Sequence, residues 1–454
     1  MKIIGKLKTL NSSEIKKSRV GIGFECVDRD LIKPEKCYDL FAATGAKWAR
    51  CQTGWAKCEK EKGVYDFSWL DDMVDNLRQR GVEVWFNVGY GNPIYMKDIT
   101  NPTAVGCVPT LYGEEVITAW KNYIKALSVH FKGRVTWWEI WNEPDGKGFW
   151  YPGTPNASEY AELIKLTGGI IKQSIPNAKI AMCTSGSHLD YLKEAFSVLD
   201  AGDIALYNIH TYHRHPETCP RSLRAGEIRA LLDECGLPDV EIGMGEVGHA
   251  SWHPVGHYFV NEGGGSESRQ AIYAAREFFL DFMWGLKFTS WFIIADIAEK
   301  VYQTATRNEK RPSDQGLLHG RIYTPKKAHE VVSYLGVLLS GETVLSEKKI
   351  SVEWEKGAED NELVAFSYTR DGKDLYVYWN PLPVESDEPV KMGNTVHLPE
   401  TDIVDTILID TYSGAVIIPE DGEWCKENST ITNVPLTIYP FVIANRDSFE
   451  VNSF

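Results

Sequence analysis

The sequence of 454 residues lacks the features of several large classes of protein. Its 48 lysine and arginine residues are outnumbered by 63 aspartate and glutamate residues, so the net charge at pH 7 is −15. This excess of negative charge repels the phosphates of a nucleic acid and the surface of an anionic membrane, so we expect neither partner. No stretch of about 18 apolar residues occurs either, and the sequence therefore predicts no membrane-spanning helix.

The chain also lacks the cysteine spacing of a metal or redox motif. Its nine cysteines are scattered, with no Cys-x-x-Cys pair, which is typical of reduced thiols in a cytosolic protein. Residues 1–8 are charged and contain no apolar core of a secretory signal, so we expect a cytoplasmic protein. Because no glycine-rich phosphate loop and no Gly-x-Ser-x-Gly element occurs, no cofactor is implied.

What the chain does contain is a regular alternation of short apolar segments and amphipathic segments. The apolar segments have the length of strands and cover residues 19–26, 46–54, 82–89, 135–143, 178–186, 205–213, 240–246 and 287–296. The segments between them, such as 114–131 and 158–174, repeat their apolar residues every three or four positions, as helices do. Eight strand-and-helix units predict an α/β fold, a (β/α)8 TIM barrel over residues 16–343.

The pattern changes after Gly341. Short strand candidates separated by turn residues follow, and Asp371–Gly372 between two of them predicts a hairpin. These segments predict an antiparallel, β-sandwich-like side domain over residues 344–454. Residues 1–15 precede the first barrel strand, and they are candidates to join this side domain.

Two glutamates stand where a barrel enzyme keeps its catalytic groups. Glu143 ends the fourth predicted strand within a Trp-Asn-Glu-Pro sequence, and Glu246 ends the seventh. The C-terminal ends of barrel strands surround one mouth, so we expect these two carboxyl groups to face each other. Hydrolysis of a glycosidic bond uses such a pair of carboxyl groups.

The Trp-Asn-Glu-Pro sequence at 141–144 makes the chain resemble a large clan of retaining (β/α)8 glycosidases. Within the clan it looks nearest to family 39, which is β-xylosidase-like, and families 5 and 30 are close. The resemblance implies that Glu143 is the acid/base, Glu246 the nucleophile and Asn142 a contact of the sugar 2-hydroxyl. Met-Gly-Glu-Val-Gly around Glu246 is closer to the family 5 pattern than to the Thr-Glu usual in family 39.

The same resemblance implies supporting roles at other strand ends. Arg50 ends the second strand and is implied to bond the nucleophile, where its positive charge would keep a carboxylate ionised. His210 and Tyr212 end the sixth strand, and the tyrosine is implied to contact the nucleophile. Trp291 on the eighth strand is implied to be the stacking floor under the reacting sugar. The alternatives are an exposed arginine, a core histidine and a core tryptophan.

Further residues near strand ends or in the following loops are candidates to bind sugar hydroxyls or to stack on a sugar. They are Glu25, Trp55, Asn87, Tyr90 and Trp252. The alternative for each is an ordinary structural place in the core or on the surface.

A histidine series in the loop after the seventh strand raises the question of a metal. His249, His253 and His257 recur every four residues, a spacing that on a helix suits zinc. Pro254 and Gly256 disfavour a helix there. We therefore predict no metal site and favour sugar contacts or loop packing for these histidines.

Together these residues predict a retaining glycoside hydrolase that cleaves β-linked glycosides by double displacement. Because no secretion signal is evident, we expect exo action on small oligosaccharides or glycosides, with β-xylosides, β-glucosides and β-galactosides as candidate substrates. The alternatives are a transglycosidase or an α-L-arabinofuranosidase on the same site, or a non-catalytic carbohydrate-binding barrel. A small carbohydrate is the expected partner, and a homo-oligomer stays an open alternative.

Overall fold

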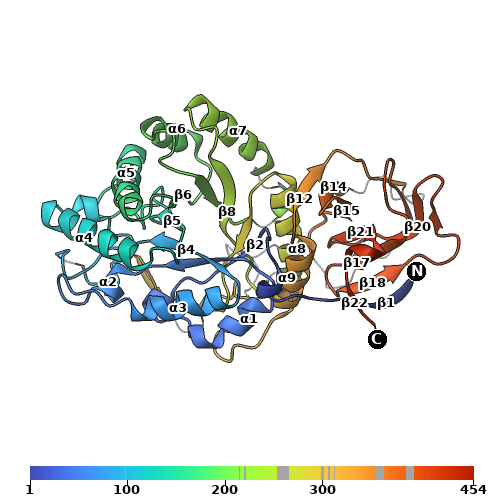
Figure 1. Cartoon of the computed structure of the whole chain (residues 1–454), viewed down its shortest axis with the longest axis horizontal. Helices are drawn as coiled ribbons and strands as arrows, with labels where there is room; N and C mark the ends of the chain where they lie inside the picture. Colours follow the sequence, from blue (N-terminus) through green and yellow to red (C-terminus); the bar gives the residue numbers. More distant parts are fainter. Residues whose placement is uncertain are drawn as a thin grey trace.

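The computed structural model describes the chain except residues 98, 214, 219–220, 253–264, 298–300, 305–306, 311, 354–361, 385–392 and 454. It consists of a closed parallel barrel and, beside it, a module of antiparallel sheets that contains both chain termini (Figure 1). The predicted fold class is therefore confirmed.

Eight parallel strands close the barrel in the order of the sequence. They are β2 (Val20–Gly23), β3 (Trp48–Gln52), β4 (Glu83–Val88), β5 (Trp137–Ile140), β6 (Lys179–Thr184), β7 (Leu206–His210), β8 (Glu241–Val247) and β9 (Thr289–Trp291). Each lies within or overlaps one predicted apolar segment, and seven of the eight strands are shorter than their segment. In those seven the prediction ran too far at the C-terminal end, because the apolar sequence continues into the loop at the barrel mouth.

Helices surround the barrel because each presents one apolar face to the strands. They are α1 (Tyr38–Ala42), α2 (Trp55–Cys58), α3 (Ser68–Gln79), α4 (Glu114–His130), α5 (Ala157–Ser174), α6 (Leu189–Val198), α7 (Arg221–Glu234), α8 (Glu267–Met283) and α9 (Lys327–Leu338). The side chains of Asn156 and Ser266 cap α5 and α8, each by accepting a backbone N–H three residues later.

The side module contains an eight-stranded sheet and a four-stranded sheet. The larger has the order β12 (Thr343–Ser346), β14 (Val364–Arg370), β15 (Lys373–Trp379), β21 (Phe441–Asn445), β17 (Thr406–Asp410), β18 (Ala415–Ile418), β1 (Lys2–Leu7) and β22 (Val451–Asn452). The smaller has the order β13 (Ser351–Glu353), β16 (Gly393–His397), β20 (Thr430–Pro435) and β19 (Trp424–Cys425). The N-terminal strand thus lies in this module.

The predicted hairpin joins β14 to β15. Arg370 pairs with Lys373, and the two turn residues, Asp371 and Gly372, have φ angles of 51° and 82°. Two consecutive left-handed residues are the geometry of a type I′ turn, which Asp-Gly favours. A further hairpin, β10 (Val301–Thr304) and β11 (Arg307–Lys310), follows β9.

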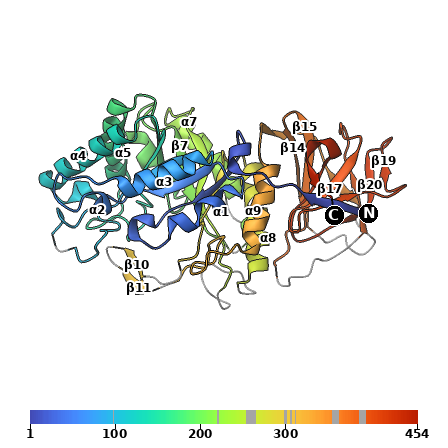
Figure 2. The same ribbon diagram turned by 60° about the horizontal axis from the view of Figure 1, so that its bottom comes forward.

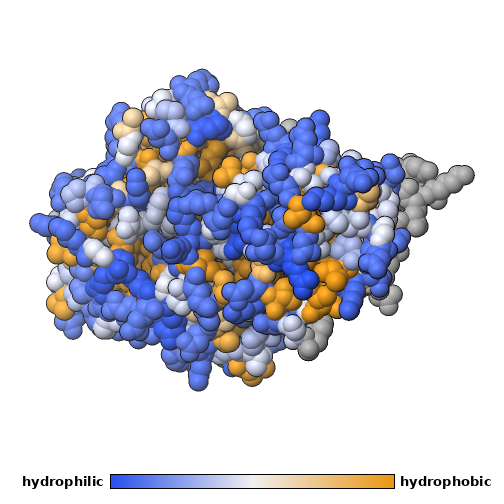
Figure 3. All heavy atoms as spheres, turned by 45° about the vertical axis from the view of Figure 1, so that its right-hand side comes forward, coloured by the Kyte–Doolittle hydropathy of each residue, from blue (hydrophilic) through white to orange (hydrophobic). Residues whose placement is uncertain are grey.

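The barrel meets the side module through α8 and α9, which lie between the two parts in both views (Figures 1 and 2). On α8, Phe279 and Phe282 pack edge-on against Phe366 of β14, with ring centroids 6.1 Å away in each case. Through such apolar contacts, α8 packs against both the core of the barrel and the core of the side module. The face drawn in Figure 3 is mostly hydrophilic, with apolar side chains gathered in separate patches. Among the described residues, no helix is long and apolar enough to cross a membrane.

Candidate active site

The two predicted glutamates meet at the C-terminal mouth of the barrel. Glu143 follows β5, Glu246 lies in β8, and their side chains are 17% and 14% exposed. A carboxyl oxygen of each and a ring nitrogen of His210 all lie within 4.8 Å of one another. Retaining glycosidases hold their carboxyl groups about 5–5.5 Å apart, whereas inverting enzymes separate them by about 6.5–9.5 Å. The spacing therefore fits the retaining geometry.

The loop after β5, which carries Glu143, has an unusual backbone conformation. Trp141 and Glu143 have φ angles of 68° and 46°, in the left-handed region that residues other than glycine rarely adopt. The indole of Trp141 donates to the carbonyl of Phe149 at 2.7 Å, which anchors the loop. Strained backbone of this kind is common where a functional side chain must be held in one direction.

Arg50 on β3 is the buried hub of the site. Its Nη1 donates to Glu246 Oε2 at 2.8 Å and to Glu25 Oε1 at 3.1 Å. Its Nε donates to Glu139 at 2.8 Å, and its Nη2 donates to Glu139 and to Asn142 Oδ1. All five N–H groups of the guanidinium are thus directed at partners, which fixes Arg50 and orients the carboxyl groups around it.

Glu246 receives a second hydrogen bond from the opposite side. The hydroxyl of Tyr212, just beyond β7, donates to Glu246 Oε1 at 2.6 Å. With Arg50 on Oε2, both oxygens of this carboxylate are held in place. Burial and the neighbouring Glu246 raise the pKa of Tyr212 well above its ordinary value, so the phenol keeps its proton and remains a donor.

Glu143 has surroundings that keep its proton. Burial, followed by the negative charge of Asp145, raises the pKa of Glu143 to about 7, against the opposing effect of Arg50. Asp145 is itself held by Ser185, whose backbone N–H and hydroxyl donate to it at 2.8 and 2.9 Å. A carboxyl group that is still partly protonated near neutral pH is suited to protonate a leaving group.

His210 lies between the two glutamates. Its Nδ1 is 3.3 Å from Glu143 Oε1 and 3.7 Å from Glu246 Oε2. The ring is fully buried, and burial together with the charge of Arg50 lowers the pKa of His210, so the ring is neutral at neutral pH. A neutral imidazole with its proton on Nδ1 can donate to either carboxyl group without neutralising the acid.

One residue of the site, Glu139, escaped the sequence analysis. Glu139 on β5 is fully buried and accepts hydrogen bonds from Arg50, Asn87 and Asn208. Burial alone would raise the pKa of Glu139, but the charge of Arg50 and the hydrogen bonds from Asn208 and Arg50 lower it below its ordinary value. A signal was present, because a single carboxylate within the apolar run 137–141 must have buried partners.

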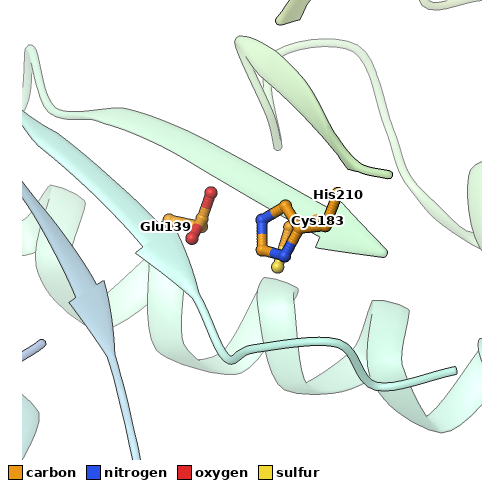
Figure 4. A group of neighbouring side chains, drawn as sticks. All are labelled: Glu139, Cys183 and His210. Carbon is orange, nitrogen blue, oxygen red and sulfur yellow. The ribbon is translucent and has the colours of Figure 1, made fainter. Parts of the chain in front are cut away.

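Figure 4 shows Glu139 together with Cys183 and His210, a group whose ligand atoms lie within 4.8 Å of one another. The chemistry of the neighbourhood argues against a cation there. The guanidinium of Arg50 lies on Glu139, and Asn208 occupies the other carboxylate oxygen. A metal would have to displace these donors and would be repelled by the fixed positive charge.

Two of the predicted substrate contacts have structural partners in the protein itself. Trp55, on α2, is fully buried, stacks on Tyr95 and Tyr123, and donates its indole N–H to Glu59 at 2.6 Å. It belongs to the core between β3 and its neighbouring helices. Asn87 is also fully buried and donates to Glu139 at 2.8 Å, so it supports that carboxylate.

The remaining candidates lie at or near the mouth. The hydroxyl of Tyr90 accepts from Gln52 at 3.3 Å. Trp291 is buried and donates its indole N–H to the carbonyl of Gln315 at 2.9 Å. Trp252 is 68% exposed in the loop after β8. These three remain predicted sugar contacts.

Of the histidine series, only His249 can be placed. It is buried, and its ring stacks on Tyr273 with centroids 4.5 Å apart, as loop packing predicts. His253 and His257 lie outside the described residues.

A cavity of about 930 Å³ opens at the opposite mouth of the barrel, where the strands begin. Two of its basic side chains are already engaged. Arg19 bonds Thr343 and two carbonyls, and Lys287 pairs with Glu241. Residues at this mouth of a barrel stabilise the fold, whereas chemistry takes place at the other.

Residues 51–218 match the family model of Glycosyl hydrolases family 39. The matched part begins in β3 and ends in the short helix η5 (Pro216–Thr218). It includes Asn142, Glu143, His210 and Tyr212, whereas Glu246 lies beyond it.

Solved structures with low sequence identity have the same fold. A family 39 glycoside hydrolase from Bacteroides cellulosilyticus WH2 has a TM-score of 0.69 at 17% identity, over 97% of this chain and 83% of its own. A family 39 β-xylosidase from Caulobacter crescentus has a TM-score of 0.60 at 15% identity, over 94% and 95%. A family 30 xylanase, Xyn30A from Clostridium acetobutylicum, has a TM-score of 0.57 at 15% identity, over 97% and 96%. The family match and the fold support a glycosidase near family 39, so this prediction is confirmed.

Proposed function

We propose that the protein is a retaining exo-glycosidase that cleaves β-linked glycosides, with Glu143 as acid/base and Glu246 as nucleophile. The observation that carries this proposal is the approach of the two carboxyl groups within 4.8 Å around His210. One of them is held by Arg50 and Tyr212, and the other has its pKa raised to about 7.

In the first step, an oxygen of ionised Glu246 attacks the anomeric carbon while the bond from that carbon to the leaving oxygen breaks. Glu143 gives its proton to the leaving oxygen. The product is a covalent ester between the sugar and Glu246, and Arg50 and Tyr212 hold the carboxylate in the direction of attack.

In the second step, a water molecule occupies the place of the leaving group. Glu143, now ionised, takes a proton from this water, and the oxygen attacks the anomeric carbon from the face that the leaving group had occupied. The ester bond breaks, Glu246 is released as a carboxylate, and the sugar keeps its original configuration.

The substrate we propose is a small β-glycoside handled inside the cell. The eight described cysteines are free thiols, which supports a reducing compartment. A β-xyloside is the first candidate, in line with the β-xylosidase from Caulobacter crescentus that shares the fold. β-Glucosides, β-galactosides and α-L-arabinofuranosides are the other candidates, and the oligomeric state is left open.

The test is a panel of 4-nitrophenyl β-D- and α-L-glycosides with three proteins: the wild type, Glu246→Gln and Glu83→Gln. Glu83 begins β4 at the opposite mouth and is exposed, so its substitution controls for the loss of one negative charge. We expect turnover of one glycone by the wild type and by Glu83→Gln. For Glu246→Gln we expect a loss of more than about a thousandfold.

More than a few per cent of activity in Glu246→Gln would refute the assignment of the nucleophile. Proton NMR of the first product would identify its anomer, and inversion would refute the retaining mechanism. Product analysis with an added acceptor sugar separates a hydrolase from a transglycosidase, because only the latter forms mainly the new glycoside. A wild type that binds sugars and turns over none of them would instead support a non-catalytic barrel.

A further inference from the structure

Glu25 is a third carboxyl group in the site, and the two-step reaction does not use it. It follows β2 and is 1% exposed. Its Oε1 accepts from Arg50 Nη1 at 3.1 Å, and the same nitrogen donates to Glu246 Oε2 at 2.8 Å. Glu25 and the proposed nucleophile therefore share one nitrogen of one guanidinium.

The charges around Arg50 favour a neutral form of one of these carboxyl groups. A single guanidinium faces Glu25, Glu139 and Glu246, and an uncompensated buried negative charge is costly. Glu139 accepts four hydrogen bonds from side chains, and Glu246 accepts two. Glu25 accepts one, and its Oε2 is buried without a partner. The proton therefore belongs on Oε2 of Glu25.

The fold makes a specific place for this oxygen. Gly23, two residues earlier on β2, has no side chain, and a Cβ there would lie 2.0 Å from Glu25 Oε2. The carboxyl group is thus folded back over Gly23 into the barrel. This position keeps Oε2 away from water and leaves Oε1 directed at Arg50.

We propose that Glu25 is a positioning residue: as a neutral acid it accepts one N–H of Arg50 Nη1 and thereby directs the other N–H to Glu246. This role rests on the proposed function and deepens it. If Glu25 became ionised, it would compete with Glu246 for the guanidinium and turn Arg50 away from the nucleophile.

The surroundings of Glu25 agree with a neutral acid near pH 7. Burial raises the pKa of Glu25 to about 8; Arg50 opposes this shift, and Glu246 adds to it. The titratable and charged groups that face Glu25 are Arg50 and Cys51 on β3, Glu246 on β8, Tyr212 beyond β7 and the adjacent Cys26.

The first test follows the reaction of the nucleophile alone. The probe is the 2,4-dinitrophenyl 2-deoxy-2-fluoro derivative of the glycone found in the panel, whose leaving group needs no acid catalyst. We expect the rate at which the wild type is covalently inactivated to fall tenfold per pH unit above about pH 8. Glu25→Gln keeps a neutral acceptor, so its rate should be within about threefold of wild type at pH 6.5 and stay level to pH 9.5.

Glu25→Ala removes the acceptor, and its inactivation at pH 6.5 should be at least about tenfold slower, since a hydrogen bond to a charged group is lost. An inactivation rate that is kept in Glu25→Gln and lost in Glu25→Ala would show that the neutral acceptor is what matters, and not the filling of space by the side chain. An alkaline decline in Glu25→Gln equal to that of the wild type would overturn the proposal. So would an Ala variant as fast as the wild type.

The second test needs no activity and measures Tm against pH for the wild type, Glu25→Gln and Glu83→Gln. The unfolded chain releases the Glu25 proton near about pH 4.3, whereas the folded protein holds it to about pH 8. The stabilising effect of Glu25 is therefore complete below pH 4.3 and is lost as pH rises through 8. The Tm of Glu25→Gln minus that of the wild type should grow between pH 5 and pH 8, while the difference for Glu83→Gln stays constant.

A Tm difference between Glu25→Gln and the wild type that does not change with pH would refute the neutral form of Glu25, whatever activity the variants have. Absence of turnover by the wild type would instead reject the proposed function and with it the role toward the nucleophile. The Tm measurement would still show whether Glu25 holds its proton, so the two failures are distinguishable.

Discussion

Glu139 and Glu143 are four residues apart in one strand and its following loop, and their surroundings change their acidity in opposite directions. The charge of Arg50 and the hydrogen bonds from Asn208 and Arg50 hold the pKa of Glu139 below its ordinary value, despite its burial. Burial and Asp145 raise the pKa of Glu143 to about 7. At the scale of single residues, the site thus separates an anion from a proton donor by burial, neighbouring charges and hydrogen bonds.

This difference predicts a pH dependence for Glu143. The acid must be protonated in the first step, so kcat/KM of the wild type should fall tenfold per pH unit above about pH 7 for poor leaving groups. Glu143→Ala should lose about 10²- to 10⁴-fold on such substrates and far less on a 2,4-dinitrophenyl glycoside, because general-acid catalysis matters only for a poor leaving group. Steady-state kinetics with both substrates measure this contrast, and equal losses on the two would refute the acid/base assignment.

The sequence analysis predicted the site residues that stand in a recognisable motif or at the end of an apolar strand. Glu143, Glu246 and Arg50 stand at strand ends, so an apolar run followed by a charged residue sufficed to bring them to one mouth. Glu139 was missed because it stands inside a strand, where its partners come from β3, β4 and β7 and appear only once the barrel closes. Glu25 was predicted to contact sugar, and its sharing of Arg50 required the geometry.

At the scale of secondary-structure elements, α2 shows why aromatic residues near strand ends are hard to interpret. Trp55 begins this short helix three residues after β3, close enough in sequence to predict a sugar contact. In the structure its ring is fully buried and packs with Tyr95, Trp120 and Tyr123. The direction of a side chain after a strand depends on the loop backbone, and here Gly54 has a φ angle of 52°.

The placement of Trp55 predicts an effect on stability and not on the affinity for substrate. Trp55→Ala should lower the free energy of unfolding by about 3–5 kcal/mol, through lost contacts and a cavity. Trp55→Phe should cost less because it keeps a ring. Urea denaturation measures the first effect, and KM at a temperature where both variants are folded should equal that of the wild type. A raised KM with unchanged stability would restore Trp55 as a sugar contact.

At the scale of the whole molecule, the side module is joined to the barrel through α8. Arg276 on this helix is fully buried, and its Nε donates to the carbonyl of Ile438 at 2.6 Å. Its Nη2 donates to the carbonyls of Asn380 and Leu382 at 3.0 and 2.8 Å. One barrel side chain therefore donates to three carbonyl groups of the module, and these would lose that donor if Arg276 were replaced.

The same arginine reaches the loop that carries Tyr212. Its Nη1 is 3.4 Å from Glu217 in η5, and the indole of Trp379 in β15 donates to the same carboxylate at 2.9 Å. The module, α8 and the loop beyond β7 thus meet at one buried carboxylate, five residues after Tyr212. This arrangement makes the module a structural support for the mouth of the barrel.

We therefore expect Arg276→Met to uncouple the two parts. Three carbonyls would lose their arginine donor and Glu217 would lose its neighbouring positive charge, and breaking a buried charged network in this way costs about 3–5 kcal/mol. Calorimetry of Arg276→Met should show a lower Tm, with the module unfolding in a transition of its own. The Tm of Arg276→Lys, which keeps the charge without the planar guanidinium, should lie between those of Arg276→Met and the wild type. Because Glu217 lies on the loop that carries Tyr212, kcat/KM of Arg276→Met should fall below that of the wild type even where the barrel is folded. One transition at the wild-type Tm would show that the apolar contacts of α8 suffice to hold the two parts together.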